Sequence, residues 1–532
     1  MSRRFWWVAG GGSVLLFAAA IVAAVLLSST DTGQVAAGSR LAASTLPPDP
    51  PHPGDPRVSV SVSDRTVGAP IPSGYLGFSF EFQGVRAYTG SDPQHINPVL
   101  LQLIRNLSPG QSPVVRIGGN STDVSYVMAP GVKPLPYEGY RLTPSWMATT
   151  GALAKQLNAR MIMGLNLAAN DPALDAAEVS DFVNALPEGS IEAVEIGNEP
   201  NVYNKITIYH TPAGVRFHAR PRSFGYPAFR SEFQTTANRT LPLRLAGPAL
   251  AIGPDPGRGS WVNVVADLLR RQPRLSIMTV HRYPMRNCYV PPTSPQYPTI
   301  AHLLGSYASV ALAQSLTRWV GIAHAQHRHL RVDELNSVAC RGKLGVSDTF
   351  ASALWATDAL FGLARVGVDG VNVHTLPNTA YELFAFSQHN GRWRAQVRPV
   401  YYGLQLFAQA APPGARLLGV TRSGADDGLS VWATRDRQRR LRVIVINKSQ
   451  TQRKTVTVRL PAGTSATASA TVERMLAPSA RATQDVTLGG RSYGAHTGSG
   501  QLAAPELERV HAARDRVTLS VPSASAALVT VG

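Results

Sequence analysis

The chain has 532 residues, and its 51 Lys and Arg against 33 Asp and Glu give a formal net charge of +18. This length accommodates a large domain and at least one smaller one, and the 44% of hydrophobic residues is enough for a packed core. The basic residues are scattered without an aromatic ladder beside them, which argues against nucleic acid as a partner. An anionic polysaccharide or an anionic surface suits the charge better, and the alternative is a general basic bias.

The first 28 residues predict an export signal or a membrane anchor. Arg3 and Arg4 precede an apolar run over 5–27, which is long enough to span a bilayer. With the arginines inside, the remainder of the chain is expected outside the cytoplasm. We favour an anchor, with a cleaved signal peptide as the alternative. Residues 29–56 end in PPDPPHPGDP, which is typical of an extended linker.

Eight apolar strands, each followed by a helical pattern, are predicted within residues 71–411, and this order is typical of a (β/α)8 TIM barrel. The strands are predicted over Tyr75–Phe82, Val114–Asn120, Arg160–Leu167, Ala193–Glu199, Leu243–Ala249, Leu275–Tyr283, Leu330–Leu335 and Gly370–Thr375. The helices are predicted near 95–107, 144–158, 175–186, 224–238, 260–271, 300–327, 347–366 and 400–411. Ser347 is the expected N-cap of the seventh helix.

After residue 411 the helical periodicity ends. Residues 412–532 carry short alternating runs separated by Gly, Ser and Pro, which predict an all-β sandwich domain. The alternating strand in 57–70 has no partner in the barrel, so we expect it to join this C-terminal domain.

The segment Ile191–Asn201, IEAVEIGNEPN, carries the first candidate catalytic residue. Its apolar half reads as a buried strand, which breaks at Gly197 and Pro200. Glu199 is therefore expected at the carboxyl end of the strand, where α/β barrels hold their chemistry. The alternative is a solvated glutamate in a turn.

A second carboxylate, Glu334, ends the seventh strand, whereas Asp333 is expected to point to the other face. Strands four and seven face each other across a barrel mouth. Two carboxylates there suit glycoside hydrolysis, and a separation of roughly 5–5.5 Å is typical of a retaining enzyme.

The neighbouring residues divide the two roles. Glu199 follows Asn198, whose amide can hold a sugar 2-hydroxyl, so we assign it as the general acid/base. Glu334 has Tyr283 and Arg116 as candidate neighbours that keep a nucleophile ionised. The alternatives are a structural ion pair for Arg116 and rim packing for Tyr283.

The two cysteines, Cys288 and Cys340, both follow barrel strands, and we interpret them as one disulfide joining two active-site loops. The alternative is two buried thiols. They are too few for a thiolate metal cage, and without a phosphate loop, dinucleotide pattern or metal motif we expect no cofactor and no metal.

Glu195 is interpreted as a buried, satisfied acid. The histidines near the end of the sixth helix favour a solvated helix end over a metal site: His324, His327 and His329.

Several motifs resemble known enzymes. EIGNEP, DELNS and HRYP look like a clan of retaining (β/α)8 hydrolases. Within it, YLGFSFEF, VRIGGNSTD, GVSDTFASALWATDALFGLARVGVDGVNVHT and TAYELFAF resemble glycoside hydrolase family 79, which contains exo-β-glucuronidases and heparanases. The resemblance runs from about Tyr75 to Tyr402.

The resemblance implies a set of site residues. Glu199 matches the acid/base of the family and Glu334 its nucleophile. Three positions match residues that hold sugar hydroxyls: Ser79, Asp123 and Asn198. Groups around the sugar carboxylate are matched by His374, Tyr381 and the backbone beside Ala380. One departure is Val338-Ala339, where family glucuronidases present an aromatic hydroxyl.

The sequence thus predicts an extracytoplasmic retaining exo-β-glucuronidase, with a glucuronic-acid-containing glycoside or polysaccharide as substrate and the membrane as a partner of the N-terminal segment. Three alternatives stay open. They are an endo-acting, heparanase-like hydrolase of a uronic-acid polymer, a neutral-sugar hydrolase, for which Ala339 argues, and a non-catalytic carbohydrate-binding barrel. Exo and endo action differ in whether the insert at 203–230 closes off the far side of the sugar pocket.

Overall fold

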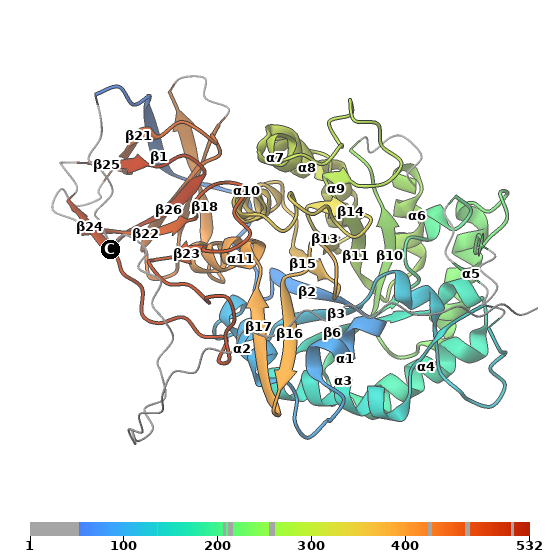
Figure 1. Ribbon diagram of the computed structural model, residues 1–532. Coiled ribbons are helices and arrows are strands. Elements are labelled where there is room, and N and C mark those ends of the chain that lie inside the picture. Colours follow the sequence, from blue (N-terminus) through green and yellow to red (C-terminus); the bar gives the residue numbers. More distant parts are fainter. Residues whose placement is uncertain are drawn as a thin grey trace, which may run out of the picture. The chain divides into compact units, whose positions relative to one another are not determined.

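The computed structural model describes residues 53–135, 137–205, 209–210, 216–254, 261–423, 428–462, 469–511 and 515–532 (Figure 1). The predicted signal or anchor at 1–28, and most of the predicted linker, lie outside these residues. Within the described part of the chain, no helix combines the length and apolar character needed to cross a bilayer.

Eight parallel strands close into a barrel, which confirms the predicted fold class. In order around the barrel they are β2 (Leu76–Glu81), β3 (Val114–Gly118), β6 (Arg160–Leu165), β7 (Ile191–Ile196), β10 (Leu245–Ala251), β11 (Leu275–Arg282), β13 (His329–Leu335) and β15 (Gly370–Thr375). Pairing of β15 with β2 closes the barrel. The strands are buried along most of their length, because helices cover a parallel sheet from outside while side chains fill it from inside.

Helices follow the strands as predicted and surround the barrel (Figure 1). They are α1 (Val85–Thr89), α2 (Pro98–Leu107), α3 (Pro144–Leu157), α4 (Pro172–Ala185), α5 (Tyr226–Arg239), α6 (Val265–Arg271), α7 (Ile300–Leu304), α8 (Leu312–Gln314), α9 (Thr317–Ala325), α10 (Phe350–Arg365) and α11 (Pro399–Ala410). Short 3-10 segments are η1 (Phe82–Gly84), η2 (Asn120–Val124), η3 (Leu167–Ala169), η4 (Pro200–Val202) and η5 (Trp261–Asn263).

Two helix predictions need correction. The expected helix over 300–327 is divided, because α7 ends before Gly305 and a π-helical turn (η6, Tyr307–Ala311) precedes α8 and α9. The prediction that Ser347 caps α10 is wrong, since the helix begins at Phe350. The Ser347 hydroxyl instead accepts hydrogen bonds from the Lys343 backbone N–H (3.1 Å) and from Ser337 (3.0 Å), and so holds the loop after β13.

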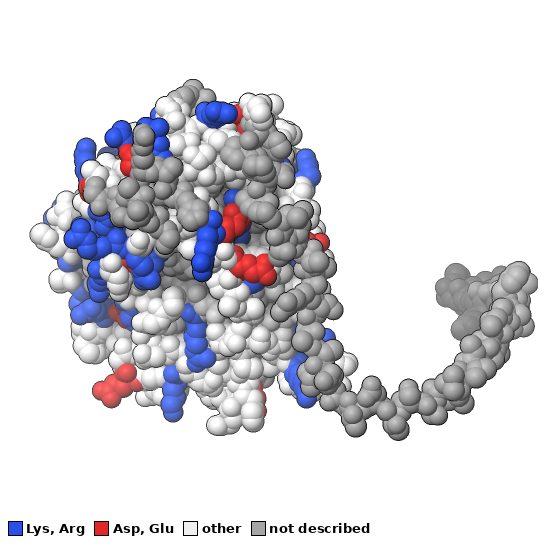
Figure 2. All heavy atoms as spheres, turned by 90° about the vertical axis from the view of Figure 1, so that its left-hand side faces the viewer, with Lys and Arg blue, Asp and Glu red and all other residues white. Residues whose placement is uncertain are grey.

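The C-terminal domain is one curled, mixed, ten-stranded sheet. Its strands are β1 (Arg57–Val67), β18 (Arg416–Arg422), β19 (Leu429–Arg435), β20 (Leu441–Asn447), β21 (Lys454–Arg459), β22 (Ser469–Leu476), β23 (Thr487–Leu488), β24 (Glu508–His511), β25 (Arg516–Val521) and β26 (Ser525–Val531). The first strand of the described chain, β1, lies between β18 and β21, which confirms that it joins this domain. Lys and Arg predominate over Asp and Glu on the face that this domain presents in Figure 2.

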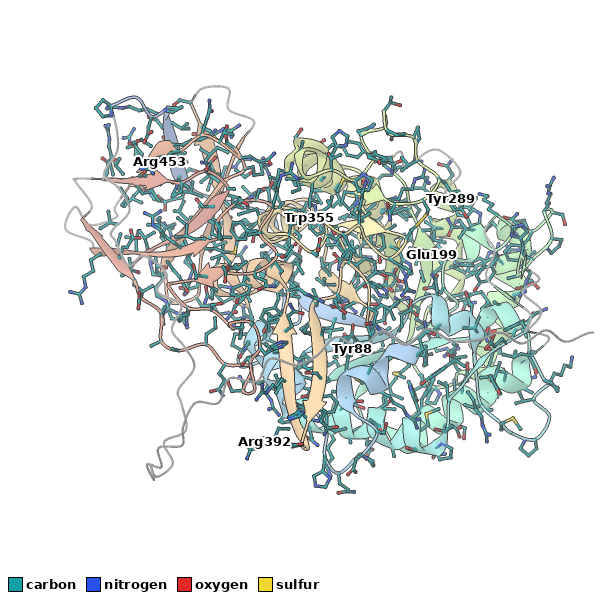
Figure 3. All side chains as sticks on the ribbon, in the orientation of Figure 1. Tyr88, Glu199, Tyr289, Trp355, Arg392 and Arg453 are labelled. Atoms are coloured by element: carbon teal, nitrogen blue, oxygen red, sulfur yellow. A yellow bond between two sulfur atoms is a disulfide. The ribbon has the colours of Figure 1, made fainter. Side chains whose placement is uncertain are left out.

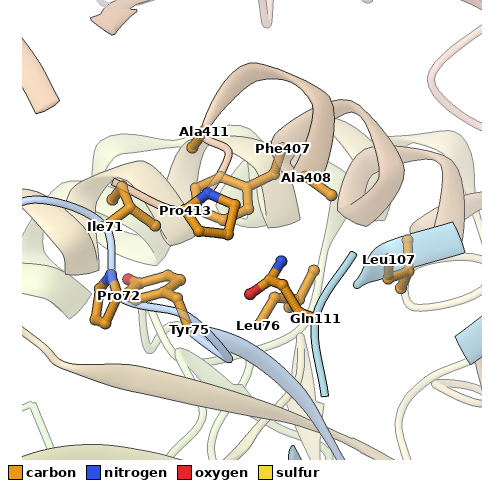
Figure 4. A pocket seen from close by; sticks show the side chains of 10 residues that line it. All are labelled: Ile71, Pro72, Tyr75, Leu76, Leu107, Gln111, Phe407, Ala408, Ala411 and Pro413. Atoms are coloured by element: carbon orange, nitrogen blue, oxygen red, sulfur yellow. The ribbon is translucent and has the colours of Figure 1, made fainter. Parts of the chain in front are cut away.

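Short strand pairs complete the described structure. They are β4 (Ser125–Tyr126) with β5 (Tyr140–Arg141), β8 (Tyr209–His210) with β9 (Arg216–Phe217), β12 (Met285–Arg286) with β14 (Val338–Ala339), and the hairpin of β16 (Phe384–His389) with β17 (Arg392–Val397). A small pocket lies at the opposite end of the barrel from the loops that carry these strand pairs. It lies beside Tyr75 and Leu76 at the start of β2 (Figure 4).

A buried ion pair joins the barrel to the β domain. The Lys448 ammonium lies 2.9 Å from one oxygen of Asp358 in α10, and the Trp432 indole N–H donates to the other at 2.9 Å. Burial raises the pKa of Asp358, but Lys448 and these hydrogen bonds outweigh burial and hold the pKa below its ordinary value. Asp358 is thus ionised and fully paired in the native protein.

Replacing Asp358 by Ala should lower the free energy of unfolding by about 3–5 kcal/mol, because it leaves the Lys448 charge buried and unpaired. The double variant Asp358→Leu with Lys448→Met removes both charges and should recover most of this loss. Chemical denaturation followed by tryptophan fluorescence measures both variants. Equal destabilisation of the single and double variants would contradict this account.

Candidate active site

Glu199 occupies a strained position at the barrel mouth (Figure 3). Strand β7 ends at Ile196, and Gly197 then adopts a φ of 79°. Glu199 itself has a φ of 53°, in the left-handed region that is unfavourable for a side chain, and precedes η4. Its backbone N–H donates to the Ala249 carbonyl of β10 at 2.9 Å. A non-glycine residue held in this conformation is a common feature of functional sites.

Glu334 lies within β13, and the neighbouring Asp333 corrects a prediction. The pairing of β13 shifts register on both sides, between Val280 and His281 on β11 and between Val332 and Leu335 on β13. Such a bulge breaks the two-residue alternation of a strand. Asp333 therefore does not face away from the barrel interior; its Oδ2 lies 3.3 Å from Arg116 Nε, and its side chain is fully buried.

The two predicted catalytic carboxylates lie close together. An oxygen of Glu199 and an oxygen of Glu334 lie within 4.8 Å of each other, and the His281 ring lies within the same distance of both. His281 Nδ1 is 3.0 Å from Glu199 Oε1 and 3.6 Å from Glu334 Oε2. His281 was not predicted as a site residue, although it opens the HRYP motif at the end of β11.

Arg116, on β3, is the cation at the centre of the site. Its side chain is fully buried and donates from Nη1 to Glu334 Oε2 at 3.1 Å and from Nε to Glu195 Oε2 at 2.6 Å. Nη2 donates to the Asn198 side-chain oxygen at 3.1 Å. Burial lowers the pKa of Arg116, but the acids around it have a larger, opposite effect. The pKa therefore lies above its ordinary value, and the guanidinium stays charged. Arg116 therefore forms a structural ion pair with Glu195 and also contacts Glu334.

Glu334 is held in its ionised form. Burial raises the pKa of this carboxyl, but His374, His281 and Arg116 lower it, together with a 2.7 Å hydrogen bond from the Tyr283 hydroxyl. These effects outweigh burial and hold the pKa far below its usual range. Tyr283 and Arg116 both contact Glu334 as predicted from the sequence.

Ser79 and His374 form the wall of the site next to Glu334. The Ser79 hydroxyl accepts a hydrogen bond from Arg116 Nη1 at 3.0 Å and lies 3.0 Å from His374 Nδ1. Burial lowers the pKa of His374, but Glu334 and Glu81 raise it above its ordinary value. The Tyr381 ring packs against His374, with 5.7 Å between ring centres, and against Tyr283 at 6.3 Å.

Glu81, like His281, was not predicted as a site residue. It ends β2, and its carboxylate accepts hydrogen bonds from the backbone of Asn120 (3.1 Å) and Ser121 (2.7 Å) and from the Ser121 hydroxyl. Its Oε1 lies 3.6 Å from His374 Nε2. The position of Glu81 at the end of an apolar strand, in SFEF, is the signal that could have identified it.

Asp123 and Asn198 lie next to each other below the mouth. Asp123 is 1% exposed and accepts a hydrogen bond from the Tyr203 hydroxyl at 2.8 Å. Burial raises the pKa of Asp123 to about 8, against the lowering effect of Tyr203. The backbone N–H of Asn198 donates to the same Tyr203 hydroxyl at 3.3 Å, and its side-chain NH2 donates to Asn120 at 3.3 Å. Asp123 thus supports the Asn198 loop from below.

Cys288 and Cys340 form the predicted disulfide. It joins the loops after β11 and β13, where β12 and β14 also pair in parallel. Among the other expectations, Glu195 is buried and paired with Arg116, as expected. His324 and His329 lie at 2.8 and 3.7 Å from Asp369, where a solvated helix end was favoured over a metal site.

Among the residues that the structure describes, two groups of side chains have atoms close enough to share a metal ion: Glu199, His281 and Glu334, and Glu195, His281 and Asp333. The Arg116 guanidinium lies among these acids and donates to one in each group. Because a cation already balances this negative charge, the geometry fits an ion-pair network better than a metal site.

Comparisons with known proteins agree with this architecture. The model of the glycosyl hydrolase family 79 C-terminal β domain matches residues 431–528. A β-glucuronidase of Neurospora crassa is 23% identical over 388 residues, covering 67% of this chain and 66% of its own length. A β-glucuronidase of Aspergillus niger is 25% identical over 538 residues, covering 89% of this chain and 93% of its own length.

Solved structures share the fold. The 4-O-α-L-rhamnosyl-β-D-glucuronidase of Fusarium oxysporum 12S superposes with a TM-score of 0.68 at 19% identity, over 88% of this chain and all of that one. The GH51 arabinofuranosidase of Xanthomonas axonopodis pv. citri gives 0.65 at 14% identity, over 90% and 100%.

The barrel, the β domain and the sequence relatives together define a glycoside hydrolase. More particularly, the chain is related to glycoside hydrolase family 79 and is similar to fungal β-glucuronidases, which confirms the resemblance found in its motifs.

Neutralising Glu195 or Asp333, the two buried acids next to Arg116, should change the stability of the protein by different amounts. Burial and the Glu195 charge raise the pKa of Asp333 well above its ordinary value, whereas Arg116 outweighs burial and lowers the pKa of Glu195. Asp333→Asn therefore keeps the native charge and should cost less than about 1.5 kcal/mol of stability, whereas Glu195→Gln removes the partner of Arg116 and should cost about 3–5 kcal/mol. Urea denaturation of both variants measures this, and an equal loss would contradict the assignment.

Asp123 makes stability depend on pH. Its folded-state pKa of about 8 lies above the ordinary value of 3.8, so between these values the folded protein holds a proton that the unfolded chain has lost. Its contribution is complete at acid pH and is lost as pH rises toward 8. Relative to Asp123→Asn, the free energy of unfolding of the wild type should fall by roughly 1 kcal/mol per pH unit between pH 5 and 8. Denaturation at four pH values measures the difference, and a constant value would refute it.

Proposed function

We propose that the chain is a retaining exo-β-glucuronidase that releases glucuronic acid from a β-linked glycoside by double displacement. The observation that carries this proposal is the pair of carboxylates at the barrel mouth, with one oxygen of Glu199 within 4.8 Å of one oxygen of Glu334. This spacing fits direct attack on the sugar by one carboxylate, as in retaining enzymes. An inverting enzyme needs a larger separation of roughly 6.5–9.5 Å, with room for a water molecule.

The environments of the two glutamates support different roles. Glu334 receives hydrogen bonds from Arg116 and Tyr283, which keep it an anion and aim it into the site. Glu199 has His281 as its neighbour, at 3.0 Å, and is the more exposed of the two, with 20% of its side chain accessible against 12% for Glu334. An acid/base residue must exchange protons with the leaving group and then with water, which the more open position permits.

The reaction then runs in two balanced steps. Glu199 donates its proton to the glycosidic oxygen while Glu334 attacks the anomeric carbon, so the bond to the leaving group breaks and a glycosyl ester with Glu334 forms. Glu199, now a carboxylate, takes a proton from water as that water attacks the same carbon, and Glu334 leaves as a carboxylate. The configuration is retained because it is inverted twice.

Recognition of a glucuronate is supported by the residues beside Glu334. Asn198, oriented by Arg116, is placed to hold the sugar 2-hydroxyl. His374 and Tyr381, with the backbone at Ala380, are proposed to surround the sugar carboxylate. Glu334 and Glu81 raise the pKa of His374, which favours the cationic form of its ring beside the proposed carboxylate position and thereby a uronate over a neutral sugar. The β-glucuronidases among the relatives support the same substrate class.

The first test is turnover of 4-nitrophenyl β-D-glucuronide against the β-glucoside and β-xyloside by the full chain. We expect a clear preference for the glucuronide, because His374 and Tyr381 line the site. Preference for a neutral sugar would keep the mechanism and overturn the substrate, in line with the absence of a tyrosine at Ala339. A folded protein inactive on all three would favour endo action or carbohydrate binding alone.

Matched glutamine variants test the two roles. Glu334→Gln should lower kcat by roughly 10⁴-fold or more on every glycoside, because no ester can form. Glu199→Gln should lose much less on 4-nitrophenyl glucuronide than on a glycoside with a poorly acidic leaving group, since 4-nitrophenolate leaves without a proton. Near-normal activity of Glu334→Gln, or the same loss on both substrates for Glu199→Gln, would contradict the assignment.

We also propose that the enzyme acts outside the cytoplasm, attached through the N-terminal segment or secreted after its cleavage. The Cys288–Cys340 disulfide supports this location, because disulfides persist in oxidising compartments. Cell fractionation with an antibody to the β domain tests the proposal, and recovery of the protein in the cytosol would overturn it.

A further inference from the structure

A rim of two loops continues directly from the candidate active site. It consists of residues 285–299 after β11 and residues 338–344 after β13, and we call it the disulfide rim. The Cys288–Cys340 bond and the β12–β14 pair join its two loops. Asn287 adds two hydrogen bonds of 3.1 Å, from its backbone to Ala339 and from its side chain to Gly342. These cross-links fix the rim relative to Tyr283 and Glu334, which lie just before it in the chain.

The disulfide rim is positively charged. Its cations are Arg286, Arg341 and Lys343, and none of them forms an ion pair with another described residue. Residues 285–299 contain no Asp or Glu. The Lys343 ammonium lies 4.4 Å above the Tyr297 ring and 3.3 Å from its hydroxyl, which holds the charge in place without neutralising it.

The same rim presents an aromatic ring to solvent. Tyr289 is 87% exposed, more than any other large hydrophobic residue in the described part of the chain. It follows Cys288 directly and has a left-handed φ of 54°. Burial does not explain this conformation, so the cross-linked loop holds the ring outward at a cost in backbone energy. Figure 3 shows Tyr289 on the loops of the barrel, well away from Arg392 on the β16–β17 hairpin.

We propose that the disulfide rim binds an acidic oligosaccharide that extends from the active site, with Tyr289 stacking on a sugar ring and the three cations pairing with its carboxylates. An exposed aromatic ring provides a flat apolar surface, and unpaired Arg and Lys select an anionic ligand. The position of the rim, directly beyond the catalytic strands, favours the substrate chain over an unrelated anion. This proposal deepens the proposed function and rests on it, because it names the leaving group as part of a uronic-acid polymer.

The test separates the rim from the catalytic pocket. Binding of a tetrasaccharide of alternating glucuronic acid and N-acetylglucosamine to full-length Glu334→Gln is measured by calorimetry, at low and high salt. Adding Tyr289→Ala, or Arg286→Ala with Arg341→Ala, should weaken binding about three- to tenfold, and high salt should reduce only the effect of the arginines. Arg392→Ala, an exposed arginine on the β16–β17 hairpin, is the matched control and should bind like its parent. A neutral N-acetylglucosamine tetramer should bind weakly and lose affinity only with Tyr289→Ala.

Turnover of 4-nitrophenyl β-D-glucuronide by Tyr289→Ala and by Arg286→Ala, with Glu334 intact, should be unchanged, because both side chains are exposed on the loop after β11. Arg341 stays in place in this assay, because its carbonyl accepts a hydrogen bond from the Ala380 backbone beside the proposed sugar carboxylate. Unchanged binding of the acidic tetrasaccharide would overturn the proposal. So would an equal loss on the small glucuronide, which would place the cations in the sugar pocket. Loss of binding to anionic vesicles instead of the tetrasaccharide would assign the rim to a membrane surface. A wild type that binds the tetrasaccharide through the rim but does not hydrolyse any glucuronide would overturn the proposed function and still support binding at the disulfide rim.

Discussion

The architecture of the site depends on one buried cation. Arg116 lies inside the barrel with no exposed surface, and its guanidinium reaches groups contributed by four other strands, β2, β7, β11 and β13, and by the loop after β7. A charge buried in this way is tolerated only when every donor has an acceptor. The positions of Glu195, Glu334, Ser79 and Asn198 are therefore coupled, and a shift of any one of these strands would leave part of the guanidinium unpaired.

This coupling links the stability of the barrel to its chemistry. Arg116 donates hydrogen bonds to both Glu195 and Glu334, so its positive charge is shared between two carboxylates. The bulge in β13 brings Asp333 into the same interior space, where burial and the Glu195 charge raise its pKa and disfavour a further negative charge. The site thus combines an ionised Glu334, the proposed nucleophile, with a neighbouring carboxyl whose pKa is raised.

Much of the fold followed from the sequence because a parallel strand buried on both faces reads as an uninterrupted apolar run. All eight barrel strands were located for this reason, and the change from helical to alternating patterns after residue 411 located the β domain. The apolar runs also indicated Glu199, Glu334, Tyr283 and Arg116. They could be predicted because a polar or charged residue stands out within or just after an apolar run.

Residues whose role depends on local geometry could not be predicted in this way. The orientation of Asp333 follows from a bulge, which leaves no mark in the alternation of residue types. Ser347 has the composition of a cap, but it bonds the preceding loop because α10 begins three residues later. His281 and Glu81 were visible at strand ends, yet their significance follows from contacts with Glu199 and His374 that link distant segments.

The place of β1 inside the ten-stranded sheet, between β18 and β21, has a consequence for biosynthesis. This strand is the first described element of the chain, but both of its neighbours, β18 and β21, are translated only after the complete barrel. On the ribosome it must remain without its sheet partners while some 350 residues emerge, a delay set by the sequence separation of the pairing strands. Its alternation of valine with serine keeps one face polar during that interval, which limits the apolar edge available for pairing with another chain.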